Sequence, residues 1–177
     1  MINFRDYLHF AEKQVMLAEE ELSKSLDANW ALIPAAILAW SAVESFVNNR
    51  LDEFATLPES ILELHERAFL LEKKIRLADS GAKLGQFILE GTEYNRLEDK
   101  IFFLIAKFGE QGARKVKRGD SLWKRFQEFK NARDALVHPR QDRQALLSVV
   151  NAKEFIQTSK EIIKLLSQNV WGREVQF

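Results

Sequence analysis

Apolar residues recur along this chain at spacings of three and four, which is the period of an amphipathic α-helix. Six stretches follow this pattern, and they cover residues 4–22, 30–51, 61–75, 97–108, 122–137 and 149–166. Gly81 and Gly109 end the third and fourth helices, and Asp120 or Ser121 can cap the fifth. No strand is predicted. The pattern therefore predicts an all-α fold, a single bundle of about six helices formed by residues 1–177.

Length and composition favour a soluble protein. The chain has 177 residues, of which 46% are hydrophobic, enough for one globular domain with a sizeable core. It contains no cysteine, which excludes disulfides and thiolate zinc sites and fits a reducing cytoplasm. The longest strongly apolar run, WALIPAAILAW, has eleven residues, too few to span a bilayer. We expect a cytoplasmic protein without a membrane partner.

Charge is distributed unevenly, although the net charge is zero. Residues 107–143 contain eleven Lys/Arg and five Asp/Glu, so this segment is basic and the remainder is acidic. A neutral protein with one basic segment can offer a local surface for phosphate groups. The alternative is an ordinary solvated loop and helix face.

Two glycine-containing segments separate the predicted helices. The segment DSGAKLGQFILEG lacks the strand-to-helix context and the lysine-hydroxyl ending of a phosphate-binding loop. We interpret it as a connection that Phe87 and Ile88 attach to the core. The segment GEQGARKVKRGD is more basic and can either grip an RNA backbone or solubilise the surface. Its basic residues are Arg114, Lys115, Lys117 and Arg118.

Two charged residues interrupt the apolar faces of the predicted helices. Glu44 lies in the face of the second helix, and Arg133 lies in the face of the fifth. Because an isolated buried charge costs several kcal/mol, each needs a partner or water. We therefore expect Glu44 and Arg133 to face each other, with Asn48 one turn further along. Such a pair can serve a functional site or can simply fix how two helices dock.

His138 lies at the end of the same helix. It precedes Pro139, which cannot continue a helix. Asp134 lies one turn before the histidine, close enough to orient its ring, and Arg133 lies about 140° round the helix from it. One copy of the chain therefore supplies a cation and an acid–base group, but not a complete site.

At these residues the sequence resembles the HEPN superfamily, whose helical domains include many metal-independent ribonucleases. The family signature is an arginine, usually followed by a polar residue, and a histidine a few residues later, near the end of a helical bundle. Here RDALVH supplies Arg133, Asp134 and His138, and Glu44 matches a charged residue on an earlier core helix. The likeness covers most of the chain in architecture but few residues in sequence. The most familiar form of the motif has asparagine where this chain has Asp134.

The resemblance implies a homodimer in which the motifs of two copies meet around one RNA phosphate. His138 would act as general acid or base and Arg133 would stabilise charge on the phosphate. Glu44, with Asn48, would hold Arg133, and Asp134 would orient His138. The ribose 2′-hydroxyl would be the nucleophile, so neither a metal nor another cofactor is expected. The products would be a cyclic phosphate and a 5′-hydroxyl.

The resemblance further implies a toxin or defence factor, neutralised by an antitoxin such as a small nucleotidyltransferase. Flanking phosphates would contact the basic residues Lys130, Arg140, Arg143, Arg114, Lys115, Lys117 and Arg118. Two alternatives stay open. One is a non-catalytic HEPN domain that binds RNA, nucleotide or a protein. The other is a helical adaptor without a nucleic-acid role.

The remaining histidines and tryptophans have structural interpretations. His9 and His65 belong to no zinc-binding spacing. For Trp40 and Trp123, core packing is a better interpretation than stacking on a base.

Overall fold

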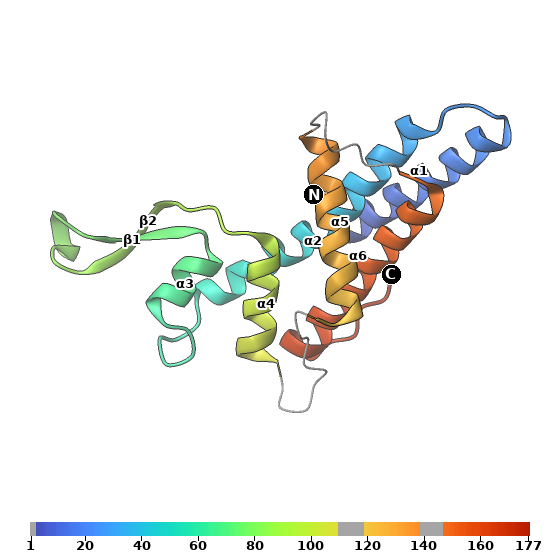
Figure 1. Ribbon diagram of the computed structural model, residues 1–177. Helices are drawn as coiled ribbons and strands as arrows, with labels where there is room; N and C mark the ends of the chain where they lie inside the picture. The colour runs from blue at the N-terminus through green and yellow to red at the C-terminus, as the bar shows by residue number, and fades with distance from the viewer. Residues whose placement is uncertain (1–2, 110–118, 139–146) are drawn as a thin grey trace. The chain divides into compact units, whose positions relative to one another are not determined.

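The computed structural model describes residues 3–109, 119–138 and 147–177. Within these ranges the chain forms six α-helices, one short 3₁₀ helix and two strands (Figure 1). The helices are α1 (Phe4–Ser23), α2 (Asn29–Ala55), α3 (Leu64–Leu70), α4 (Leu97–Phe108), α5 (Ser121–Val137) and α6 (Val149–Trp171). The 3₁₀ helix η1 spans Gly81–Lys83, and the strands are β1 (Lys73–Leu77) and β2 (Phe87–Thr92). The predicted all-α class is confirmed for these residues.

The chain divides into two compact units. The first comprises residues 1–46 and 105–177, and the second comprises residues 47–104. The sequence predicted a single domain over residues 1–177, and that remains a prediction.

In the first unit, α1 and α6 run antiparallel. Lys160 Nζ lies 2.7 Å from Glu12 Oε1, and Lys153 Nζ lies 2.6 Å from Glu19 Oε1, so ion pairs tie the two helices along their length. The buried residues of α1 are Leu8, Ala11, Val15 and Ala18, the apolar face that the spacing predicted. Asn3 caps this helix by accepting a hydrogen bond from the Arg5 backbone N–H at 2.8 Å.

Helix α2 is both long and apolar. Its stretch Asn29–Leu51 is long and apolar enough to cross a membrane, by length and composition only, and it extends beyond the eleven-residue run noted in the sequence. More than half of this stretch is buried in the protein, as in a core helix. Ser159 of α6 donates a hydrogen bond at 2.9 Å to the carbonyl of Ala39 in this helix. The first part of α2 is therefore packed into the first unit.

In the second unit, the third predicted helix is wrong beyond Leu70. The spacing of apolar residues carried the prediction through Ile75 toward Gly81, but α3 has only seven residues. Glu72 adopts a positive φ of 54°, which L-residues rarely do, and so ends the helical path. Contacts distant in sequence hold it there: the backbone N–H of Glu93 donates to the Glu72 carbonyl at 2.9 Å.

A β-hairpin replaces the rest of that helix. β1 pairs antiparallel with β2, with Ile75 opposite Leu89 and Leu77 opposite Phe87. The predicted attachment of Phe87 to the core is wrong, because Phe87 is 66% exposed, whereas Ile88 is half-buried. Pairing between the strands satisfies the backbone, so the segment forms a ribbon without burying these side chains.

An ion pair fixes the root of the hairpin. Lys100 of α4 is only 3% exposed, and its Nζ lies 3.0 Å from Glu72 Oε1. The same carboxylate oxygen accepts a hydrogen bond from the Asn95 backbone N–H at 3.1 Å. The second unit thus neutralises its buried cation completely.

Candidate functional site

The candidate site lies near the C-terminal end of α5, where the side of the helix that is buried in its first turns becomes exposed. Leu122, Trp123, Phe126 and Phe129 of this helix are buried. Arg133 follows one turn after Phe129, and 27% of its side chain is exposed. Val137 and His138, a turn later, are exposed. Arg133 therefore lies at the boundary between the core and solvent.

Trp40 of α2 is the surface against which Arg133 lies. The indole is 4% exposed, and the guanidinium carbon of Arg133 lies 5.7 Å from its ring centroid. This distance is within the range of an attractive cation–π interaction. Trp40 is fixed in turn by Phe126, whose ring stacks on it at 5.1 Å, and by Phe129, which meets it edge-on at 5.4 Å.

Glu44 contacts the same tryptophan. Its Oε1 accepts a hydrogen bond from Trp40 Nε1 at 2.8 Å. The predicted direct ion pair between Glu44 and Arg133 is wrong for the described chain, where no hydrogen bond or ion pair within 4.0 Å joins them. The two charges share Trp40 instead, one at its N–H and the other near its ring.

Arg133 is only partly satisfied by protein groups. Its Nη1 donates to Asp134 Oδ1 at 3.1 Å, the one hydrogen bond that its guanidinium makes to the described residues. Its Nε is buried and has no hydrogen-bond partner among the residues that the structure describes. An unpartnered buried N–H costs on the order of 1–3 kcal/mol. An apolar residue would avoid this cost, so packing alone does not account for an arginine here.

Asp134 is held between two cations. Lys130 Nζ lies 3.0 Å from Asp134 Oδ2, and Arg133 occupies the other carboxylate oxygen. Partial burial raises the pKa of Asp134, but the hydrogen bonds and positive charges of Lys130 and Arg133 lower the pKa by more. The carboxylate is therefore ionised at neutral pH, and the cluster of these three residues carries a net positive charge.

His138 caps the end of α5. Its backbone N–H donates to the Asp134 carbonyl at 2.9 Å, and its side chain is exposed. The predicted orientation of the imidazole by the Asp134 carboxylate is not found within the described chain, where Lys130 and Arg133 engage that carboxylate. Backbone geometry alone brings His138 close to the cluster.

The other predicted site residues are not part of this arrangement. Asn48 is exposed and falls in the second unit. Six predicted RNA-binding residues lie outside the described residues: Arg114, Lys115, Lys117, Arg118, Arg140 and Arg143. The core-packing interpretation of Trp123 is confirmed, since it is 5% exposed.

Sequence reasoning missed the role of Trp40 in the site. It identified Trp40 as a core residue, and its burial confirms that, but not as the group that joins Glu44 to Arg133. The available signal was its spacing, since Trp40 precedes Glu44 by four residues and so lies on the same helix face.

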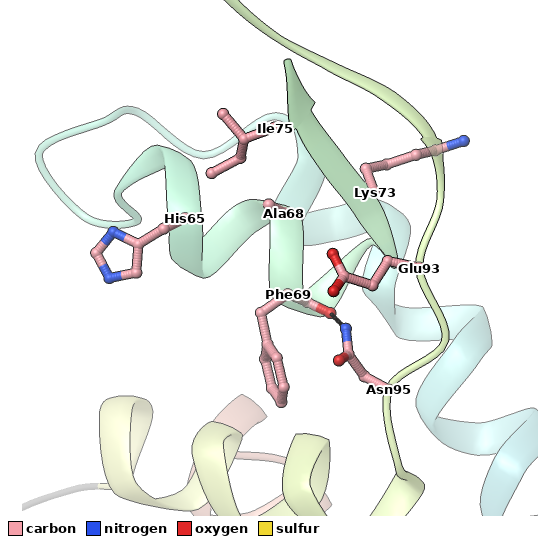
Figure 2. Close-up of a pocket in the computed structure, with 7 residues that line it drawn as sticks. All are labelled: His65, Ala68, Phe69, Lys73, Ile75, Glu93 and Asn95. Carbon is pink, nitrogen blue, oxygen red and sulfur yellow. Dashed lines mark hydrogen bonds between the residues drawn. The ribbon is translucent and has the colours of Figure 1, made fainter.

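A separate pocket of about 260 Å³ lies in the second unit between α3 and the hairpin (Figure 2). Its lining residues are His65, Ala68, Phe69, Lys73, Ile75, Glu93 and Asn95. Asn95 Nδ2 donates to the Phe69 carbonyl at 2.9 Å, which closes one end. In Figure 2 His65 stands on one side, with Lys73 and Glu93 on the other, so these polar side chains do not converge.

No group of three or more His, Asp and Glu side chains with metal-binding geometry occurs in the part of the chain that the structure describes. Comparisons of the chain with protein-family models, with curated proteins and with solved structures find no match. The HEPN assignment therefore remains a prediction that depends on Arg133, Asp134, His138 and the helical fold.

Proposed function

We propose that this protein is a metal-independent endoribonuclease of the HEPN type, with Arg133 and His138 as its reactive side chains. The observation that carries the proposal is that the Arg133 guanidinium is fixed in position and still has hydrogen-bond donors available. Its guanidinium is held against Trp40, reaches solvent and makes one hydrogen bond to the described chain. A planar, permanently charged group with donors still available is well suited to a phosphate.

The proposed reaction uses side chains from two copies of this chain and the 2′-hydroxyl of the RNA itself. The 2′-hydroxyl of the RNA loses its proton to one imidazole, and its oxygen forms a bond to the adjacent phosphorus. The bond from phosphorus to the 5′-oxygen breaks, and that oxygen takes a proton from a second acid. Arg133 stabilises the negative charge that builds on the phosphate oxygens. The products are a 2′,3′-cyclic phosphate and a 5′-hydroxyl.

Two copies of the chain complete this scheme. One protomer contributes one exposed histidine, His138 at the end of α5, whereas the reaction uses a base and an acid. A two-fold axis beside the end of α5 would bring a second Arg133 and a second His138 to the same phosphate. The homodimer is therefore part of the proposal.

Positive charge at the site, and in the sequence on either side of it, favours an anionic substrate. Lys130 adds a second cation beside Arg133, and residues 107–143 are rich in Lys and Arg. Unrestrained RNA cleavage harms a cell, so we further propose a cytoplasmic toxin or defence factor that is neutralised by an antitoxin, such as a small nucleotidyltransferase.

Cleavage of a labelled RNA oligonucleotide in the presence of a metal chelator tests the proposal. The wild-type protein should release fragments ending in a cyclic phosphate, and Arg133→Ala and His138→Ala should each lower the rate about 10²–10⁴-fold. His65→Ala and Arg76→Ala, at exposed positions in the second unit, are matched controls that should retain the rate. Intact RNA with the wild type, or equal cleavage by all four variants, would contradict the proposal.

A second candidate is a non-catalytic domain that binds RNA through the same cluster. It is favoured by the engagement of Asp134 with Lys130 and Arg133, and by the absence of a carboxylate that contacts the His138 imidazole among the described residues. This candidate predicts RNA binding that weakens as salt increases, is lost in Arg133→Ala, and is accompanied by no cleavage. Absence of any binding at low salt would favour the adaptor alternative instead.

A further inference from the structure

The indole of Trp40 is clamped from several directions. Phe126 stacks on it with the two ring planes 10° apart, and Phe129 meets it at 82°. The Glu44 carboxylate holds its N–H at 2.8 Å. With the residue 4% exposed, the ring has little freedom to turn. A fixed ring of this kind gives an arginine lying against it a defined position.

Glu44 affects more than the orientation of the indole. A carboxylate that accepts the indole N–H bond draws the proton toward itself and leaves the ring more electron-rich. A more electron-rich ring attracts a guanidinium more strongly. Glu44 can therefore strengthen the attraction between Trp40 and Arg133 without contacting Arg133. This explains why the two opposite charges both contact Trp40 and do not contact each other.

Arg133 is constrained at two points and available elsewhere. Trp40 lies against its guanidinium, and Asp134 holds Nη1. Neither contact uses Nη2, which makes no hydrogen bond to the described residues and, unlike Nε, is not among the buried atoms without a partner. This arrangement fixes the direction of the guanidinium while leaving donors for an anion. A displacement of about 1 Å in such a group can cost on the order of a hundredfold in rate.

We propose that Trp40 is a positioning residue for Arg133 in RNA cleavage, with Glu44 acting through the indole N–H. The inference rests on the proposed ribonuclease function. It assigns Trp40 no contact with the substrate and gives Glu44 an indirect role in place of the direct ion pair that the sequence suggested.

Kinetic measurements distinguish positioning from packing. Trp40→Leu should lower kcat tenfold or more with KM changed by less than about twofold, because the orientation of Arg133 and not the affinity for RNA is lost. Trp40→Phe keeps an aromatic face and should restore most of the rate. Glu44→Gln keeps a neutral acceptor for the indole N–H and should lie between Trp40→Phe and the wild type. Trp123→Phe is the matched control, since Trp123 is 5% exposed and also packs on Phe126, at 5.7 Å.

Nuclear magnetic resonance of the Arg133 Nε–Hε group gives a readout that does not need activity. The signal can be assigned by its loss in Arg133→Lys. The ring of Trp40 should shift it away from the position of an exposed arginine, and Trp40→Leu should return it there. Glu44→Gln, which is conservative enough to keep the fold, should move it part of the way, and Trp123→Phe should leave it in place.

The two measurements separate the failure of this inference from the failure of the proposed function. If the wild type cleaves RNA but Trp40→Leu leaves both kcat and the Arg133 signal unchanged, the positioning role is wrong and the ribonuclease function stands. If the wild type does not cleave RNA while the Arg133 signal responds to Trp40 and Glu44, the contact is real but its assignment to RNA cleavage is overturned. If Trp40→Leu lowers the thermal stability but keeps the full kcat, Trp40 serves only in packing and the inference is overturned.

Discussion

The two units each remove a cation from water, and they do so in different ways. In the second unit Lys100 is 3% exposed, and its ammonium lies 3.0 Å from the Glu72 carboxylate, which also fixes the root of the hairpin. In the first unit 27% of the Arg133 side chain is exposed, its guanidinium lies over the Trp40 ring, and its Nε has no partner in the described part of the chain.

The difference separates a structural cation from a functional candidate. A buried charge that is fully paired has no capacity left for a ligand, and its removal leaves its partner uncompensated. A half-buried charge held mainly by an aromatic face keeps its donors and remains accessible. We therefore expect substitution of Lys100 to affect folding and substitution of Arg133 to affect activity.

The largest expected effect on stability is that of Lys100→Ala. It leaves the Glu72 carboxylate at the hairpin root without its cation, and we expect the free energy of unfolding to fall by about 3–5 kcal/mol. Chemical denaturation measures this loss. Lys153→Ala removes a comparable pair with Glu19 that is largely exposed, and it should cost no more than about 1 kcal/mol. Equal losses in the two variants would contradict the structural role of Lys100.

Arg133→Ala should have a smaller effect on stability. The substitution loses the contact with Trp40 but also removes a buried N–H without a partner, so we expect a change within about 1 kcal/mol. The same denaturation experiment measures it. A loss as large as that of Lys100→Ala would mean that Arg133 supports the core, and the contrast between the two cations would disappear.

The smallest expected effect is the pH dependence of Asp134. In the folded protein the pKa of Asp134 lies below its ordinary value, near 3.8. Its interactions with Lys130 and Arg133 therefore stabilise the fold at pH values above the unfolded pKa. This stabilisation is lost as the pH falls through the folded pKa. Because 40% of the Asp134 side chain is exposed, solvent weakens the contribution.

A carboxyl titration followed by nuclear magnetic resonance should place the Asp134 midpoint below 3.8. Lys130→Ala and Arg133→Ala should each raise it. A midpoint at or above the ordinary value in the wild type would show that the two cations do not hold this carboxylate.

Sequence periodicity predicted the helices that bury a continuous apolar face, and it failed where pairing distant in sequence takes over. Leu8, Ala11, Val15 and Ala18 are buried as their spacing predicted. The spacing from Ala68 through Leu71 to Ile75 is equally helical, yet the chain turns into β1 at Lys73. Glu72 contacts Glu93, Asn95 and Lys100, and these contacts hold the chain in the turn. Because the partners are more than twenty residues away, the local spacing of apolar residues does not reveal them.

The sequence identified Glu44, Arg133 and His138 as candidates, but it identified neither Trp40 as the group between the two charges nor the contacts that these residues make. A charge within an apolar face identified both Glu44 and Arg133, and the end of the helix identified His138. Their opposite charges suggested a direct ion pair between Glu44 and Arg133. Instead, the Arg133 guanidinium lies over the Trp40 ring, and the Trp40 N–H donates to the Glu44 carboxylate. Likewise, spacing placed Asp134 near His138, while Lys130 one turn earlier competes for the same oxygens. Side-chain competition of this kind depends on rotamers, which the sequence does not specify.

The most direct measurement for the proposed ribonuclease follows RNA cleavage while wild-type protein is mixed with an equal amount of His138→Ala protein and the subunits exchange. If each site needs the histidine of both copies, only dimers with two wild-type subunits act, and cleavage falls to about a quarter of that given by the same total amount of wild type. A fall to about half would mean that each chain works alone, and the absence of cleavage by the wild type itself would contradict the ribonuclease function.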